Sequence, residues 1–163
     1  EQLRAEMDAT ATRSSFEVYP VEPKAPVFEA MESLAETAVK RQVKFQPTLP
    51  ALVSLVFAAP NKLSSVIASL FKLLIEDAVE NTQITIHMEE RDHWLTYTFK
   101  NTGFGIPNER LQQYLFDSEV EVSESFDNIR HAISSIEVWQ GTLTAESQVG
   151  QGLSFFLRLR SFI

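Results

Sequence analysis

The sequence predicts an α+β two-layer sandwich, in which helices pack on one face of a mixed β-sheet. Residues 61–80 carry apolar side chains at helical spacing, which indicates a long amphipathic helix. Residues 83–88 and 95–99 alternate between apolar and polar, as half-buried strands do. Because the helical and strand patterns are segregated along the chain, we expect the helices to share one face. With 163 residues and 44% hydrophobic composition, one domain with a substantial core is expected.

The first half of the chain begins with a polar stretch. Residues 1–15 are expected to be a tail or the end of a preceding helix, so that the domain itself spans residues 16–163. The expected elements of this half are, in order, a strand over 16–19 that Pro20 and Pro23 end, a helix over 26–40, strand candidates over 43–45 and 51–58, and the helix over 61–80.

The second half contains more strands, grouped around a glycine-containing loop. That loop, Asn101–Pro107, follows an alternating strand and precedes a short helical run. The expected elements of this half are strands over 83–88 and 95–99, a helix over 108–116, an acidic segment over 117–124, a helix over 127–139 that Gly141 stops, and strands over 143–145 and 153–159 around a turn at 148–152.

Composition excludes several kinds of chemistry. The net charge of -8 argues against a general affinity for nucleic acid or for an anionic membrane surface. Cysteine is absent, and His87, His93 and His131 show no metal-ligand spacing, so no metal site is expected. No catalytic residue is expected either, because no nucleophile is accompanied by a base. The chain has no signal peptide and no membrane-spanning run, and its start without Met suggests a piece of something longer.

Three segments, in this order and spacing, carry a resemblance to a known family. They are Leu73–Thr82 (LLIEDAVENT), Asn101–Pro107 (NTGFGIP) and Ala145–Leu159 (AESQVGQGLSFFLRL). Together they resemble the Asn-bearing helix, the first glycine box and the closing strand of the ATP-binding domain of sensor histidine kinases. This domain has the Bergerat (GHKL) fold. The resemblance covers nearly the whole chain from Phe16, and it implies a histidine-kinase ATPase-like fold.

The resemblance also implies where a nucleotide pocket would lie. Its vestige is expected at Asp77, Asn101, Gly103 and Gly105. Asp77 occupies the position of the family's magnesium-binding Asn, and Leu73 that of the Asn four residues earlier. Asn101 replaces the Asp that accepts a hydrogen bond from the adenine amino group. Its amide oxygen can still accept a hydrogen bond, but without the charge.

The residues themselves leave alternatives open at both positions. On a helical wheel Asp77 falls within the apolar stripe, and an inward carboxylate costs several kcal/mol unless it is paired or metal-bound. We therefore expect Asp77 to have a partner or a partly wet pocket, either as a capped or salt-bridged carboxylate at the core edge or as a retained magnesium ligand. Asn101 is equally explained as a turn residue before Thr-Gly.

The second glycine box of the family, whose backbone amides meet the phosphates, has no counterpart here. Residues 126–131 align with it and include no glycine. The preceding lid is acidic and would repel a triphosphate. Its carboxylates are Asp117, Glu119, Glu121, Glu124 and Asp127. Arg130 and His131 are the only counter-charges nearby, and we expect both at the surface.

The resemblance, with these losses, predicts a catalytically inactive kinase-like domain of a bacterial two-component phosphorelay protein. It would dock a histidine kinase, a receiver or a phosphotransfer domain, without a cofactor and without contacting nucleic acid or the membrane. We expect it to be cytoplasmic, as a module of an inner-membrane protein, such as a phosphotransfer protein of the Rcs type. One alternative is a divergent histidine kinase catalytic domain that binds ATP and magnesium. Another is a degenerate binding module of an anti-sigma-type regulator.

Overall fold

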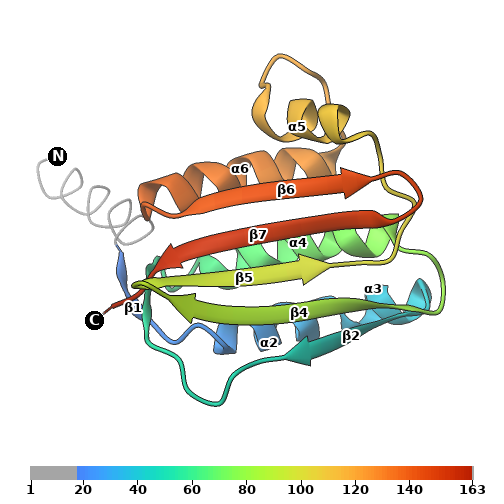
Figure 1. Ribbon diagram of the computed structural model, residues 1–163. Helices are drawn as coiled ribbons and strands as arrows, with labels where there is room; N and C mark the ends of the chain where they lie inside the picture. Colours follow the sequence, from blue (N-terminus) through green and yellow to red (C-terminus); the bar gives the residue numbers. More distant parts are fainter. Residues whose placement is uncertain (1–17, 163) are drawn as a thin grey trace, which may run out of the picture.

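The computed structural model describes residues 18–162, and its centre is a five-stranded mixed sheet (Figure 1). The strand order is β2-β4-β5-β7-β6, where only β2 and β4 are parallel. These strands are β2 (Val43–Thr48), β4 (Thr82–Arg91), β5 (Trp94–Lys100), β6 (Thr142–Gln148) and β7 (Gly152–Arg160). A separate antiparallel pair consists of β1 (Tyr19–Val21) and β3 (Val56–Ala58).

Three helices, α2 (Ala25–Ser33), α4 (Leu63–Asp77) and α6 (Glu124–Val138), cover one face of the sheet, behind it in Figure 1. The short helix α3 (Ala35–Lys40) leads into β2, and α5 (Asn108–Phe116) packs against β6 and α6. This arrangement confirms the predicted fold class, with helices packed on one face of a mixed sheet. Among residues 18–162, no helix combines the length and the apolar character needed to cross a bilayer.

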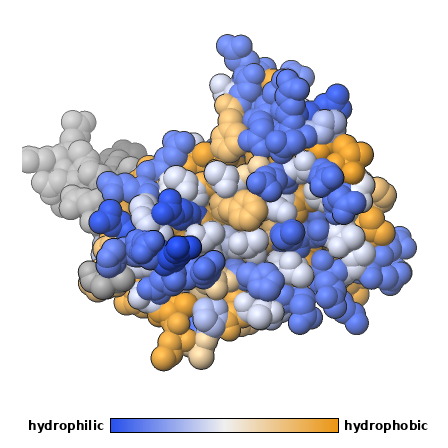
Figure 2. Space-filling model, viewed as in Figure 1, coloured by the Kyte–Doolittle hydropathy of each residue, from blue (hydrophilic) through white to orange (hydrophobic). Residues whose placement is uncertain are grey.

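The core lies between the sheet and the helices. The alternating strands direct one set of side chains, such as Ile84, Ile86 and Phe99, toward the helices, where they are fully buried. Phe71 of α4 fills the centre, with its ring centroid 5.2 Å from that of Phe45 and 4.9 Å from that of Phe99. The opposite sheet face carries threonines and charged side chains, and it is the face toward the viewer in Figure 2.

Several predicted boundaries are wrong. The helix expected over 26–40 is broken at Leu34 into α2 and α3. Pro20 does not end the first strand but lies within β1, where a proline is tolerated because β1 has only one partner strand. Of the strand candidate 51–58, only β3 pairs. Of the strand predicted over 16–19, Tyr19 lies in β1 and Val18 is not in a strand. Residues 16–17 and the predicted tail at 1–15 lie outside the described residues.

Candidate functional site

The glycine-containing loop joins β5 to α5 and lies where the end of α4 meets the turn between β6 and β7. The Phe104 amide donates to the Asp77 carbonyl at 3.1 Å, and the Gly150 amide donates to the Phe104 carbonyl at 2.7 Å. The Gly103 amide donates to the Gln151 carbonyl at 3.1 Å. The structure therefore brings together the four residues that the sequence assigned to a vestigial pocket: Asp77, Asn101, Gly103 and Gly105.

Both glycines of this loop are required by packing. A Cβ atom on Gly103 would lie 2.2 Å from Asp77 Oδ2 and 2.5 Å from the Asp77 carbonyl oxygen. Gly105 has a φ of 68°, and a Cβ there would lie 2.2 Å from the carbonyl oxygen of Gln148. The close approach of three backbone segments explains these glycines without a ligand.

Asp77 is the last residue of α4 and is partly buried. Its Oδ1 accepts a hydrogen bond from the Gly105 amide at 3.1 Å, and its Oδ2 accepts one from Asn101 Nδ2, also at 3.1 Å. Burial raises the pKa of this carboxyl above its ordinary value of 3.8, although the two hydrogen bonds oppose the shift. The expected partner thus exists, and it is an amide and a backbone N–H; within residues 18–162 Asp77 forms no ion pair.

This raised pKa predicts a pH-dependent stability. The folded state holds the Asp77 proton more tightly than the unfolded chain does, so stability from this group falls as pH rises from 3.8 through the folded pKa. We expect wild type to lose stability relative to Asp77→Asn between pH 4 and pH 7. Urea unfolding of both proteins across this range measures the difference. A constant difference, or a gain for wild type with rising pH, would contradict the expectation.

Asn101 is only 8% exposed, and protein groups occupy both ends of its amide. Nδ2 donates to the Leu74 carbonyl at 2.8 Å as well as to Asp77. Oδ1 accepts from the Leu153 amide at 2.7 Å. Because the Leu153 N–H can only donate, it identifies the oxygen end of the side chain. Asn101 therefore ties α4 to β7, and its oxygen faces the sheet backbone.

Helix α6 begins earlier than predicted, at Glu124 instead of residue 127. Ser123 is its N-cap, with Oγ accepting from the Phe126 amide at 3.5 Å, and acidic residues follow in the first turn. A serine followed by acidic residues is typical of a helix start, so Ser123 could have predicted that α6 begins at residue 124. Residues 126–131, where the resemblance would place the phosphate-binding glycines, are therefore helical. Ser125 Oγ donates to Glu76 Oε1 at 2.8 Å and joins α6 to the end of α4.

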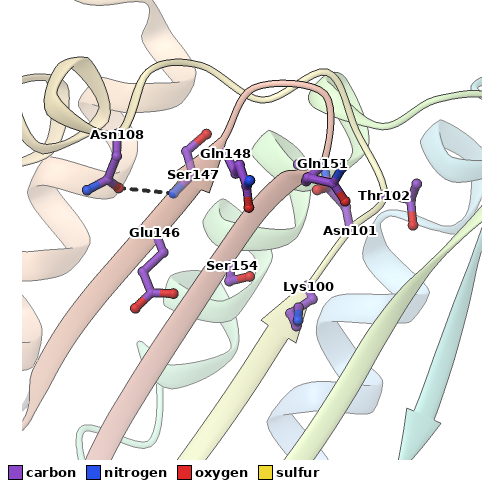
Figure 3. Close-up of a pocket in the computed structure, with 10 residues that line it drawn as sticks. Lys100, Asn101, Thr102, Asn108, Glu146, Ser147, Gln148, Gln151 and Ser154 are labelled. Atoms are coloured by element: carbon purple, nitrogen blue, oxygen red, sulfur yellow. Dashed lines mark hydrogen bonds between the residues drawn. The ribbon is translucent and has the colours of Figure 1, made fainter.

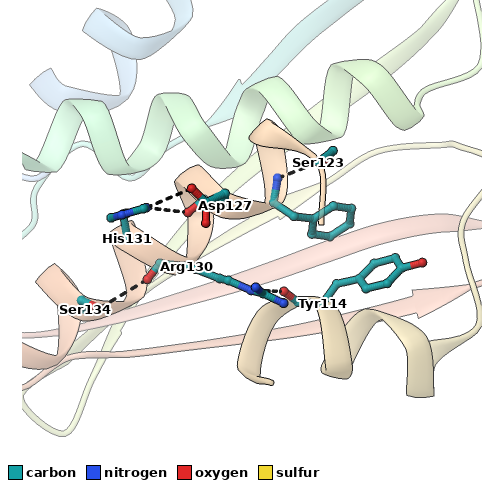
Figure 4. A network of polar contacts seen from close by, with 7 residues as sticks. Tyr114, Ser123, Asp127, Arg130, His131 and Ser134 are labelled. Atoms are coloured by element: carbon teal, nitrogen blue, oxygen red, sulfur yellow. Dashed lines mark hydrogen bonds and ion pairs between the residues drawn. The ribbon is translucent and has the colours of Figure 1, made fainter. Parts of the chain in front are cut away.

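The other side of α6 is fastened to α5 (Figure 4). Arg130 is partly buried, and its guanidinium donates to the carbonyls of Tyr114 and Asp117, each at 2.7 Å. Arg130 thus stays partly exposed, as a surface residue does, but its charge is hydrogen-bonded to the C-terminal carbonyls of α5, which the sequence did not predict. His131 does lie at the surface, with Nδ1 2.8 Å from the Asp127 carbonyl oxygen.

A second feature, which the sequence reasoning missed, is a hollow of about 660 Å³ on the sheet face opposite the helices (Figure 3). Lys100, Ser154 and Glu146 lie side by side across β5, β7 and β6 in its floor, as the strand register requires. Its remaining lining is polar side chains and backbone: Asn101, Thr102, Asn108, Ser147, Gln148, Gln151 and Gly152. Alternation along the three strands was the signal that could have grouped them.

Comparison with known proteins gives structural relatives only. No family model matches the sequence, and no curated protein matches it either. Among solved structures, the catalytic domain of histidine kinase ThkA in a nucleotide-free form aligns with a TM-score of 0.74 at 19% identity, over 89% of this chain and 96% of that one.

Two further kinases align comparably. Acinetobacter baumannii histidine kinase AdeS has a TM-score of 0.71 at 14% identity, over 91% of this chain and 69% of that one. Full-length ShkA in complex with AMPPNP has a TM-score of 0.72 at 13% identity, over 89% of this chain and 32% of that one. At these identities the likeness concerns the fold. The chain has the fold of histidine kinase catalytic domains, a mixed sheet with helices packed on one face.

Proposed function

We propose that this domain is a catalytically inactive kinase-like module of a bacterial two-component phosphorelay protein, and that it works by docking other proteins. The fold supports the kinase-like part of this proposal. The hydrogen bonding of Asn101 is the observation that carries the inactive part. A group that would have to face the adenine is instead bound at both ends by α4 and β7.

The arrangement of α6 gives independent support. A triphosphate needs free backbone amides, and residues 126–131 use theirs within a helix. The helix is also joined to both neighbours, through Ser125 to Glu76 and through Arg130 to the end of α5. The residues present therefore do not fit magnesium-ATP, and we derive no phosphoryl transfer from them.

The proposed partners are proteins of the same phosphorelay: a histidine kinase, a receiver or a phosphotransfer domain. The net charge of -8 disfavours nucleic acid and anionic membrane surfaces as partners. We further propose a cytoplasmic location, in a protein anchored elsewhere in its chain to the inner membrane. A relation to phosphotransfer proteins of the Rcs type remains a prediction.

The alternative is a divergent kinase domain that binds ATP, and a thermal-shift experiment separates the two. A ligand at 100 times its dissociation constant stabilises the folded state by about 2.7 kcal/mol. For the inactive module we expect no shift of the melting temperature with magnesium-ATP, up to millimolar concentration, beyond that caused by magnesium with inorganic phosphate. A saturable rise specific to ATP would contradict the proposal and favour the alternative.

A further inference from the structure

A hollow of about 410 Å³ lies between the end of α5, the loop after it and the start of α6. It is lined by the apolar or aromatic side chains of Tyr114, Val122 and Phe126 and by the polar side chains of Glu121 and Ser123. All five side chains are exposed or partly exposed, so the hollow is open to solvent. Two aromatic rings and a carboxylate are a suitable combination for a cationic group.

The walls of this hollow are preformed. The rings of Tyr114 and Phe126 meet edge to face, with centroids 5.0 Å apart and planes at 65°. Arg130 links the two helices that carry them, because it lies on α6 and donates to the Tyr114 carbonyl on α5 (Figure 4). Ser123 caps α6 at the rim. A bound group would therefore not have to order the site first, which favours binding.

The surroundings of the hollow are acidic. Glu119, Glu121 and Glu124 form no ion pair with any residue between 18 and 162. Two of the nearby cations are engaged, because Arg130 donates to backbone carbonyls and His131 lies against Asp127, while Arg110 lies one helical turn before Tyr114 on α5. In Figure 2 the surface over α5 and the following loop is largely hydrophilic. The hollow is therefore complementary to a positively charged partner, which such a field attracts.

We propose that this hollow, the Tyr114–Phe126 pocket, receives an arginine side chain from a protein partner. The guanidinium would lie against the aromatic rings and pair with Glu121, while the neighbouring carboxylates attract other basic residues of the same partner segment. Arginine fits better than a point charge because its planar group stacks on rings. This inference rests on the proposed docking function and specifies the chemistry of the docked surface.

A titration with blocked tripeptides tests the proposal on the domain. The probes are acetyl-Gly-Arg-Gly-amide and its citrulline counterpart, which has the same shape without the charge. We expect the arginine peptide to shift the ¹⁵N amide signals of residues 114–126 in a saturable way, and to bind at least about threefold more tightly than the citrulline peptide. Equal effects of both peptides, or shifts spread evenly over all acidic surfaces, would overturn the proposal.

Matched variants separate the pocket from general charge. Glu121→Gln and Glu119→Gln remove the same charge, but only Glu121 lines the hollow. We expect Glu121→Gln to weaken the arginine peptide at least about threefold and Glu119→Gln to have a smaller effect. Tyr114→Leu should weaken it as well, whereas Phe116→Leu, on the same helix but outside the hollow, should not. Equal losses for Glu119→Gln and Glu121→Gln would overturn the proposal.

Two further outcomes are informative. Tighter binding of tetramethylammonium than of the arginine peptide would overturn the assignment to a protein side chain and indicate a small quaternary amine. The peptide titration and the ATP test can fail separately, because they use different ligands, although Phe126 belongs both to the pocket and to the 126–131 segment. A domain that binds ATP and also binds the arginine peptide would refute inactivity while supporting the pocket. A domain that binds neither would support inactivity and refute the pocket.

Discussion

Asn101→Asp is expected to destabilise the domain by about 3 kcal/mol, because it places a buried carboxylate beside the partly buried one of Asp77. Asn101 Nδ2 donates to Asp77 at 3.1 Å and to the Leu74 carbonyl at 2.8 Å. In the wild type, the oxygens of Asp77 and of the Leu74 carbonyl accept hydrogen bonds from Asn101. In the variant they would face a carboxylate oxygen instead. Urea unfolding at pH 7 measures the loss, and acidification should reduce it by protonating the carboxylates.

The matched control is Asn108→Asp, the same chemical change at an exposed residue. Asn108 Oδ1 accepts from the Ser147 amide at 3.1 Å, and a carboxylate retains this bond. Its position at the start of α5 also favours a negative charge, so we expect a change within about 0.5 kcal/mol. A similar loss of stability in both variants would mean that repulsion between Asp77 and residue 101 does not cause the loss.

The double variant Asp77→Asn with Asn101→Asp exchanges the two groups. One carboxylate remains, and the new amide can donate to it. We expect the double variant to be at least about 1 kcal/mol more stable than Asn101→Asp alone, since side chains in direct contact are energetically coupled. Recovery will be incomplete, because the Leu74 carbonyl still loses its donor. Strict additivity of the two changes would refute direct coupling between these side chains.

The fold was predictable because its central elements repeat a simple pattern. Alternation along 83–88 and 95–99 identified the middles of β4 and β5, and the boundaries of α5 were predicted correctly. Helix α4 was expected over 61–80 and forms over 63–77. The prediction was too long because the apolar pattern continues past the helix into the residues that contact the glycine loop. Local periodicity is a reliable guide where the burial of one apolar face decides which element forms.

The site was less predictable because its geometry depends on contacts between distant segments. The sequence placed Asp77 and Asn101 together through the resemblance, but it could not orient the amide. Orientation is set by the Leu153 amide, 52 residues away along the chain. The role of Arg130 was missed for the same reason, since its acceptors are carbonyls on α5 and after it, which any sequence would supply.

The same contacts bear on the proposed loss of function. Asp77 and Asn101 carry an amide and a carboxylate in the reverse order to that which the resemblance implies for a kinase. Helix α6 is hydrogen-bonded to α4 and α5 at the place where a kinase of that kind would need a phosphate-binding loop. Restoring one position would leave the other obstacle in place. We therefore propose that the kinase fold persists here as a rigid support for protein contacts, and that the surface around the Tyr114–Phe126 pocket has become the functional one.

Gly105→Ala is expected to cost about 3 kcal/mol or more and to disrupt the glycine loop. Gly105 has a φ of 68°, in the left-handed region, and a Cβ atom there would lie 2.2 Å from the Gln148 carbonyl oxygen and 2.8 Å from its carbon. A backbone group cannot rotate away as a flexible side chain does, so the loop and the β6–β7 turn would have to separate. That separation would also strain the Gly105 amide bond to Asp77.

Gly150→Ala isolates the cost of the backbone conformation from the cost of the clash. Gly150 also has a positive φ, 82°, but a Cβ atom there would meet nothing within 4 Å. We expect a loss of about 1 kcal/mol, the ordinary cost of placing alanine in the left-handed region. Urea unfolding of both variants gives the difference, which measures how tightly the glycine loop is packed against the turn. Equal losses would show that this packing yields readily, and that the space beside Asp77 can open for a ligand.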